Sequence, residues 1–226
     1  MFTFWFYLAC VLMPVEWFVV AKGLRDLRWI TKPAPMIALI IWYFQIAGWG
    51  GYLIWFGLAL FLSLAGDIIL LFPKRYFIYG LVAFLSAHVC YIIGFNLVWP
   101  NLSSMWWVLI LLVVAVIAYM DFHPLADTMR RSPYTQRMVG PVTAYGFIIS
   151  FMLFSAWINF FRPGWDILPA ALSAIGATLF FISDSTLARE TFQKPFRGSR
   201  VIVMSTYLLG QLGIITGALM ALAGGH

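Results

Sequence analysis

Apolar residues occur in long runs that are separated by short breaks of proline, glycine and charged residues. A membrane-spanning helix needs about 20 mostly apolar residues, and the pattern predicts eight such helices. The second and fifth runs are the shortest. The alternation typical of a transmembrane β-barrel is absent from the sequence, so we expect an all-α fold. The expected spans are 2–21, 33–47, 52–72, 76–98, 105–120, 138–160, 167–188 and 200–223.

The breaks between the runs are short and rich in turn-forming residues. The longest connection, at about 121–137, is polar and contains Pro124 and Pro133, so we expect it to be a solvated loop. No stretch remains for a separate soluble domain. The sequence therefore predicts a single transmembrane domain, residues 1–226, built as a bundle of helices with short loops.

Composition supports this interpretation. Hydrophobic residues make up 63% of the chain and charged residues 10%, against about a quarter charged in a typical soluble domain. A water-soluble fold of this length leaves too much surface in water to hide so many apolar side chains. A soluble enzyme, a nucleic-acid binder and a disordered chain are therefore excluded, and nucleic acid is not an expected partner.

The net charge of +6 comes from basic residues that gather in alternate loops. Of 14 lysines and arginines, 13 lie after the first, third, fifth and seventh spans, and only Arg162 lies elsewhere. Cytoplasmic loops carry such an excess of positive charge. We therefore expect both termini on the non-cytoplasmic side of a multi-pass protein, in the plasma (inner) membrane if it is bacterial. The basic positions are Lys22, Arg25, Arg28, Lys32, Lys74, Arg75, Arg130, Arg131, Arg137, Arg189, Lys194, Arg197 and Arg200.

The start of the chain and the cysteines give two smaller predictions. The first apolar run begins at Met1 without a preceding basic segment, so it is expected to be a retained span rather than a cleaved signal peptide. Cys10 and Cys90 lie inside apolar runs, far apart in sequence. They are predicted to be buried free thiols, without a disulfide framework or a zinc motif.

Four ionisable residues fall inside predicted spans: Glu16, Asp67, His88 and Asp184. Such groups cost at least about 2.5–3.5 kcal/mol near the bilayer centre and usually mark functional sites. Asp67 lies seven residues before Lys74, and Asp184 lies five before Arg189, so both are about 10 Å below the basic layer. Two acids at one depth favour a shared site in a cavity open toward the cytoplasmic leaflet. For Glu16 we favour a structural partner.

Other polar residues fall within the same predicted bundle. Tyr207 and Gln211 are spaced i, i+4 and therefore share a helix face, while Lys32 precedes a proline that suits a first helical turn. We expect these residues to bind substrate or to orient the two acids, although hydrogen bonds between helices would also explain several of them. The set is Lys32, His88, Tyr145, Ser183, Tyr207 and Gln211.

Two further patterns have simpler explanations. The small residues Thr206, Gly210, Gly213 and Gly217 form a stripe that favours close helix packing. Asp121, His123 and Asp127 resemble metal ligands in type, but we expect them to be solvated in the loop at 121–137. Zinc held by Asp67, Asp184 and His88 is a possible alternative, although a single intramembrane histidine is fewer than zinc enzymes commonly use.

Two close carboxylates in a medium of low dielectric do not both ionise readily, so one can serve as an acid while the other stays anionic. Glycosidases use this arrangement to cleave an acetal through an oxocarbenium ion. The pair is therefore suited to a lipid-soluble substrate that reacts through an oxygen-stabilised cation. A serine lipase is disfavoured, because the sequence lacks the G-x-S-x-G motif.

The chain resembles the lysoplasmalogenases, the YhhN-like membrane proteins. The resemblance covers nearly the full length in order: Lys32-Pro33, SLAGD ending at Asp67, GLVAFLSAHVCY with His88, FISDSTLA with Asp184, and YLLGQ with Tyr207 and Gln211. Residues 99–136 carry no matching motif. The resemblance implies hydrolysis of the vinyl ether of a lysoplasmalogen to a fatty aldehyde and glycerophosphoethanolamine or glycerophosphocholine. It also assigns catalysis to Asp67 and Asp184.

The chemistry of the two acids fits this implied reaction. One aspartic acid would protonate the vinyl ether, and the other would stabilise the cation and activate water. Lys32 would meet the phosphate of the lysophospholipid substrate, and neither a cofactor nor a metal is required. Two alternatives remain: a small-molecule or lipid transporter or receptor with a proton-relay aspartate pair, and a metal-dependent hydrolase of the ceramidase type. The sequence does not indicate the oligomeric state.

Overall fold

The computed structural model describes residues 2–48, 50–101, 103, 105–193 and 196–222. Every regular element in these residues is helical, which confirms the all-α prediction. Three short 3₁₀ turns, η1 Lys74–Tyr76, η2 Gln136–Met138 and η3 Ile158–Phe161, accompany the α-helices. The α-helices are α1 Phe4–Lys22, α2 Arg28–Thr31, α3 Pro33–Ala47, α4 Ile54–Ile69, α5 Phe77–Asn96, α6 Trp106–Arg130, α7 Val139–Trp157, α8 Ile167–Phe192 and α9 Ser199–Leu222.

The membrane character of the chain is clear from the helices. Seven of the described segments are long and apolar enough to cross a bilayer, with α2 and α3 together forming one of them. The remaining apolar helix, α4, has 16 residues and is about 24 Å long, shorter than the roughly 30 Å hydrocarbon core. The chain is thus an integral multi-pass membrane protein, and the count of eight spans stays a prediction.

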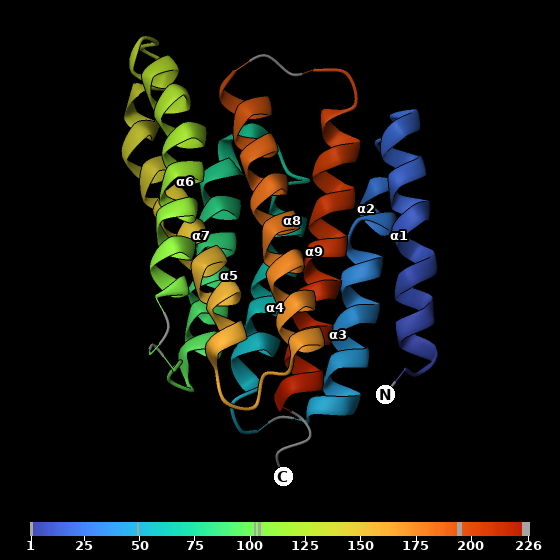
Figure 1. Ribbon diagram of the computed structural model, residues 1–226. Coiled ribbons are helices and arrows are strands. Elements are labelled where there is room, and N and C mark those ends of the chain that lie inside the picture. The colour runs from blue at the N-terminus through green and yellow to red at the C-terminus, as the bar shows by residue number, and fades with distance from the viewer. Residues whose placement is uncertain (1, 49, 102, 104, 194–195, 223–226) are drawn as a thin grey trace.

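The helices run up and down in chain order, so that α1 begins and α9 ends at the same end of the bundle (Figure 1). The connections that follow α1, α4, α6 and α8 all lie at the opposite end (Figure 1). These connections, with the adjoining helix ends, hold the predicted cluster of basic residues, of which Lys194 lies outside the described residues. The side of the membrane that this basic end faces stays a prediction.

Two local signals place Lys32 at the basic end. Gly23 ends α1 with a φ of 69°, a left-handed conformation that costs glycine little. The chain then turns back through α2, and Pro33 occupies the first turn of α3, where its missing N–H is not needed. Lys32 is therefore held where α2 meets α3, with its side chain directed into the bundle, since only 5% of the residue is exposed.

The prediction of a loop at 121–137 is wrong for its first half, because α6 continues through Pro124 to Arg130. The proline removes one backbone donor, but packing outweighs this loss. Leu125 and Met129 are buried together with Val142 of α7, and Asp121 pairs with Arg189 of α8. Tertiary contacts thus maintain a helix that its local sequence disfavours.

Helices α8 and α9 make the closest approach in the bundle. A Cβ added to Gly176 of α8 would lie 2.5 Å from the backbone nitrogen of Ile214 and 2.7 Å from the carbonyl oxygen of Gly210. Gly213 and Gly217 likewise face the backbone of α8. The stripe of small residues therefore serves helix packing, as its spacing predicts, and it fixes α9 against the helix that carries Asp184.

Candidate active site

Asp67 lies in the last turn of α4, and its partners come from two other helices. Its Oδ1 is 3.2 Å from the ammonium nitrogen of Lys32, and its Oδ2 accepts a hydrogen bond of 2.7 Å from the hydroxyl of Tyr207. Lys32 also donates to the backbone carbonyl of Asp67 over 2.9 Å. Asp67 is 2% exposed, so this carboxylate has a buried cation as its immediate partner.

Asp184 lies in α8 and has different partners. Its Oδ2 is 3.0 Å from His88 Nε2, an ion pair if the histidine is protonated, and accepts a hydrogen bond from the Tyr145 hydroxyl. His88 Nε2 and the Tyr145 hydroxyl are themselves 2.9 Å apart. His88 is fully buried, and its Nδ1 has no hydrogen-bond partner in the described part of the chain. No lysine or arginine of the described residues forms an ion pair with Asp184.

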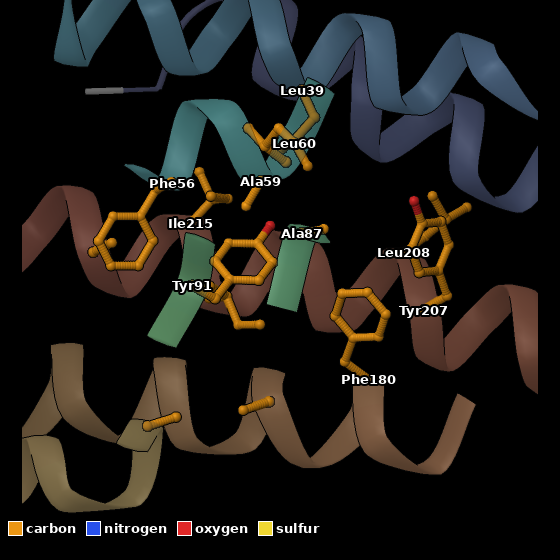
Figure 2. Packing of buried hydrophobic residues seen from close by; sticks show 14 of the residues in the cluster. Leu39, Phe56, Ala59, Leu60, Ala87, Tyr91, Phe180, Tyr207, Leu208 and Ile215 are labelled. Carbon is orange, nitrogen blue, oxygen red and sulfur yellow. The ribbon is translucent and has the colours of Figure 1, made fainter. Parts of the chain in front are cut away.

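Both aspartates line one cavity of about 840 Å³, together with Tyr207 and Ser183. Phe180 contacts one partner of each acid. Its ring centroid is 4.7 Å from that of His88, which is next to Asp184, and 5.3 Å from that of Tyr207, which is next to Asp67. Figure 2 shows Phe180 and Tyr207 in the same buried cluster as Tyr91. The structure thus brings together the two acids that the sequence places at one depth.

A second, apolar pocket adjoins this cavity. It is lined by Leu81, Phe122, Val142 and Ala188, and it reaches Tyr145 and Asp184. Asp184 lines both spaces, whereas Asp67 lines only the larger one. We refer to the apolar pocket, which is the more enclosed space and has a volume of about 30 Å³, as the inner pocket, and to the larger space with its charged lining residues as the outer part.

Charged residues surround the outer part of the cavity. Arg28, Arg75, Glu190 and Arg200 all line it. Arg28 forms an ion pair of 3.1 Å with the buried Glu16, and Arg200 forms one of 2.8 Å with Glu190. The interaction of Glu16 with Arg28, and with the Thr31 hydroxyl, fits the structural role expected for it.

The remaining predicted residues lie nearby with defined partners. Gln211 accepts a short hydrogen bond from the Tyr91 hydroxyl, and its Nε2 has no partner among the described residues. The Ser183 hydroxyl donates to the carbonyl of Val203 in α9 over 2.9 Å. These two residues therefore act at least as contacts between helices, while Ser183 also faces the cavity.

The metal-like residues of α6 pair among themselves and with arginines. His123 and Arg130 both lie close to Asp127, at 3.4 Å and 3.1 Å. Across the described ranges, no three histidine, cysteine, aspartate or glutamate side chains come together in a group that could hold a metal ion. Cys10 and Cys90 are free thiols, as predicted, and are partly rather than fully buried.

Sequence reasoning missed the charged rim of the cavity. Arg28 lies four residues before Lys32, and Arg200 lies seven before Tyr207, so helical spacing places each on the same face as a candidate site residue. That spacing was a usable signal. The pairing of Arg28 with Glu16 and of Arg200 with Glu190 had no comparable signal, because it depends on which helices become neighbours.

Comparison with known proteins gives one consistent family. Residues 27–218 match the model of the YhhN family. The chain is 31% identical to "Lysoplasmalogenase TMEM86B" of Rattus norvegicus over 215 residues, covering 89% of this chain and 82% of the relative. It is 32% identical to the protein of the same name from Mus musculus, covering 95% and 84%. It is also 27% identical to the "Uncharacterized membrane protein YhhN" of Escherichia coli O157:H7, covering 83% and 85%. No solved structure matches the chain.

Proposed function

The chain belongs to the YhhN family, and on this premise we propose that it is a lysoplasmalogenase. In this proposal it hydrolyses the vinyl ether of a lysoplasmalogen to a fatty aldehyde and glycerophosphoethanolamine or glycerophosphocholine. The supporting observation is that two buried carboxylates line one cavity, one paired with a lysine and the other in contact with a histidine and a tyrosine. The site would face the cytoplasmic leaflet, following the positive-inside rule.

We place the first carbons of the alkenyl chain at the apolar inner pocket, whose volume is about 30 Å³, and the glycerol and headgroup in the polar outer part. This orientation matches apolar to apolar and charged to charged surface. The vinyl ether then lies where the two spaces meet, beside Asp184. Its β-carbon, which is bonded to the chain, faces Asp184. Its α-carbon and oxygen, on the headgroup side, lie toward Asp67.

In this orientation Asp184 is the proton donor. We propose that His88, 3.0 Å away, is neutral and that Asp184 carries its proton in the resting enzyme, since an ionised carboxylate without a cationic partner is costly in an apolar interior. Its Oδ2 accepts from Tyr145, and His88 can donate to the same atom if its proton is on Nε2. That tautomer leaves the unpartnered Nδ1 of His88 as an acceptor rather than a buried donor. The acidic proton is then on Oδ1, available to the substrate.

Asp67 is the anion in this mechanism. Its ion pair with Lys32 compensates the negative charge, and Tyr207 orients the carboxylate by donating to Oδ2. A fixed carboxylate beside the α-carbon stabilises the oxocarbenium ion as it forms. Lys32, for which the sequence suggests a phosphate ligand, is in the structure bound to Asp67. We propose that its main task is to keep Asp67 ionised.

The steps balance with water as the other reactant. Asp184 gives its proton to the β-carbon, and the electron pair of the double bond forms the new C–H bond, leaving the oxocarbenium ion. Water adds to the α-carbon while Asp67 takes its proton, which yields a hemiacetal. The hemiacetal hydroxyl then returns a proton to Asp184, the C–O bond to glycerol breaks, and Asp67 protonates the glycerol oxygen. Both acids finish as they began.

Release of fatty aldehyde by the purified protein tests the proposal. We expect the protein in maltoside micelles to convert a lysoplasmenylethanolamine to aldehyde, and to leave the saturated alkyl-ether analogue intact because that analogue has no double bond to protonate. A protein that binds the substrate but releases no aldehyde would contradict the enzymatic proposal and favour a transporter or receptor. Loss of activity on removal of divalent metal would favour the metal-dependent hydrolase.

A further inference from the structure

One arginine at the cavity mouth differs from its neighbours in having no carboxylate partner. Lys32 is paired with Asp67, Arg28 with Glu16, and Arg200 with Glu190. Arg75 lines the same cavity, and its guanidinium lies over the ring of Tyr76, whose centroid is 4.8 Å from its Cζ. Among the described residues, Arg75 is therefore the cation on this surface whose charge no acidic side chain compensates.

The short connection that carries Arg75 is held in place by aromatic contacts. The ring of Phe72 lies 5.1 Å from that of Trp29 in α2 and 6.0 Å from that of Tyr76, measured between centroids. The backbone N–H of Tyr76 donates to the carbonyl of Pro73 over 2.9 Å. The guanidinium thus sits on a packed turn at the end of α4, the helix that places Asp67 in the site.

We propose that Arg75 binds the phosphate of the lysophospholipid and so selects phosphate-bearing lipids for this cavity. This inference rests on the proposed function, in which the headgroup occupies the outer part of the cavity. A phosphodiester carries one negative charge, which matches the single uncompensated cation. A guanidinium can bind two phosphate oxygens at once. The ammonium group of the headgroup then points toward solvent.

The positive-inside rule alone would also place an arginine here, so the test must separate the two explanations. Arg25 is the matched control. It lies at the same end of the bundle, on the connection after α1 (Figure 1), and it does not line the cavity. Replacing either arginine with glutamine removes one positive charge from that end, but only Arg75→Gln removes it from the cavity.

Direct binding of two unreactive lipids provides the measurement. One is the saturated alkyl-ether glycerophosphoethanolamine, and the other is the corresponding alkylglycerol, which has the same chain but no phosphate. Both are radiolabelled and measured in maltoside micelles free of phospholipid, so that bilayer headgroups do not compete. Inorganic phosphate is added in a parallel series to determine whether Arg75 recognises phosphate itself or only phosphate delivered on a lipid.

We expect Arg75→Gln to weaken binding of the phosphate-bearing lipid by about 10- to 100-fold, the usual effect of losing a hydrogen-bonded charge. Binding of the alkylglycerol should be unchanged, Arg25→Gln should affect neither lipid, and Arg75→Lys should recover part of the loss. Equal affinity of wild-type and Arg75→Gln protein for the phosphate-bearing lipid would overturn the inference. So would an equal loss for both lipids, which would show that Arg75 shapes the cavity without recognising phosphate.

These outcomes are separate from failure of the proposed function. A wild-type protein that binds the phosphate-bearing lipid yet releases no aldehyde from lysoplasmalogen would refute the enzyme. The binding ratio of the two lipids would still decide the role of Arg75. A wild-type protein that binds neither lipid would overturn both proposals.

Discussion

The ion pair between Lys32 and Asp67 allows folding and catalysis to be tested separately. Asp67→Asn keeps the shape of the side chain and its hydrogen bond from Tyr207, but it leaves the Lys32 ammonium buried without a counter-charge. Removing one partner of a buried pair typically costs about 3–5 kcal/mol. With His88 neutral, as proposed, Asp184→Asn removes no cation's partner, so its effect on stability should be small. The two isosteric changes should therefore differ strongly in stability.

Catalysis should respond in a different pattern. Each aspartate is proposed to act on the substrate, and one positioned acid or base contributes about 10²–10⁴ in rate. Both single variants should therefore lose nearly all aldehyde release, whatever their stability. The double variant Lys32→Met, Asp67→Asn removes both charges, and replacing a buried pair with neutral groups is often neutral or stabilising. It should recover the stability of the wild type while remaining inactive.

The assay combines thermal unfolding in maltoside micelles with aldehyde release measured on protein that is still folded. Asp184→Asn serves as the internal control, because we expect it to be inactive without being destabilised. Asp67→Asn as stable as the wild type would refute the energetic argument for the ion pair. Near-normal turnover by the double variant would refute the catalytic role of Asp67, and the pair would then be structural.

Three further predictions concern packing, substrate and topology. Gly176→Val should lower stability by about 1–3 kcal/mol, as overpacking does, because the valine side chain would meet the backbone of α9. Thermal unfolding measures this loss. The control Gly140→Ala should be close to neutral, because nothing lies within 4 Å of a Cβ added there. Ala188→Phe should fill the inner pocket and raise KM for alkenyl substrates of every chain length, because a pocket of about 30 Å³ takes only the first carbons; an unchanged KM would contradict this placement of the chain. In a protein without Cys10 and Cys90, a cysteine at position 25 should react only with a reagent applied from the cytoplasmic side, and one at the exposed position 166 only from the other side; the reverse would refute the orientation.

The helices could be predicted well where apolar runs end in strong local signals. Pro33 begins α3 as expected, and the run from 167 begins α8. The prediction failed in α6, where Pro124 and polar residues suggested a loop. Burial of Leu125 and Met129 against α7 stabilises the helix there, and a contact between helices leaves no mark in the local sequence.

The sequence predicted the depth of the two acids in the membrane but not the side chains that contact each of them. Counting from the basic residues places Asp67 and Asp184 in one layer, and both line one cavity in the structure. Their partners lie far away in sequence: Tyr207 is 140 positions from Asp67, and His88 is 96 positions from Asp184. Which partner meets which acid depends on the order of helices around the bundle, and that order follows from side-chain packing.

The difference between the two acids follows from this arrangement. Asp67 lies in the last turn of α4, whose neighbour α3 begins directly after Lys32, so antiparallel packing brings a residue of the basic layer to its carboxylate. Asp184 lies at a similar depth, but the helices beside it contribute His88 and Tyr145 instead. Depth alone would give both carboxyl groups the same character. In the proposed mechanism the neighbouring helices make one a compensated anion and leave the other to hold a proton, and this is the difference that acid–base hydrolysis of a vinyl ether would use.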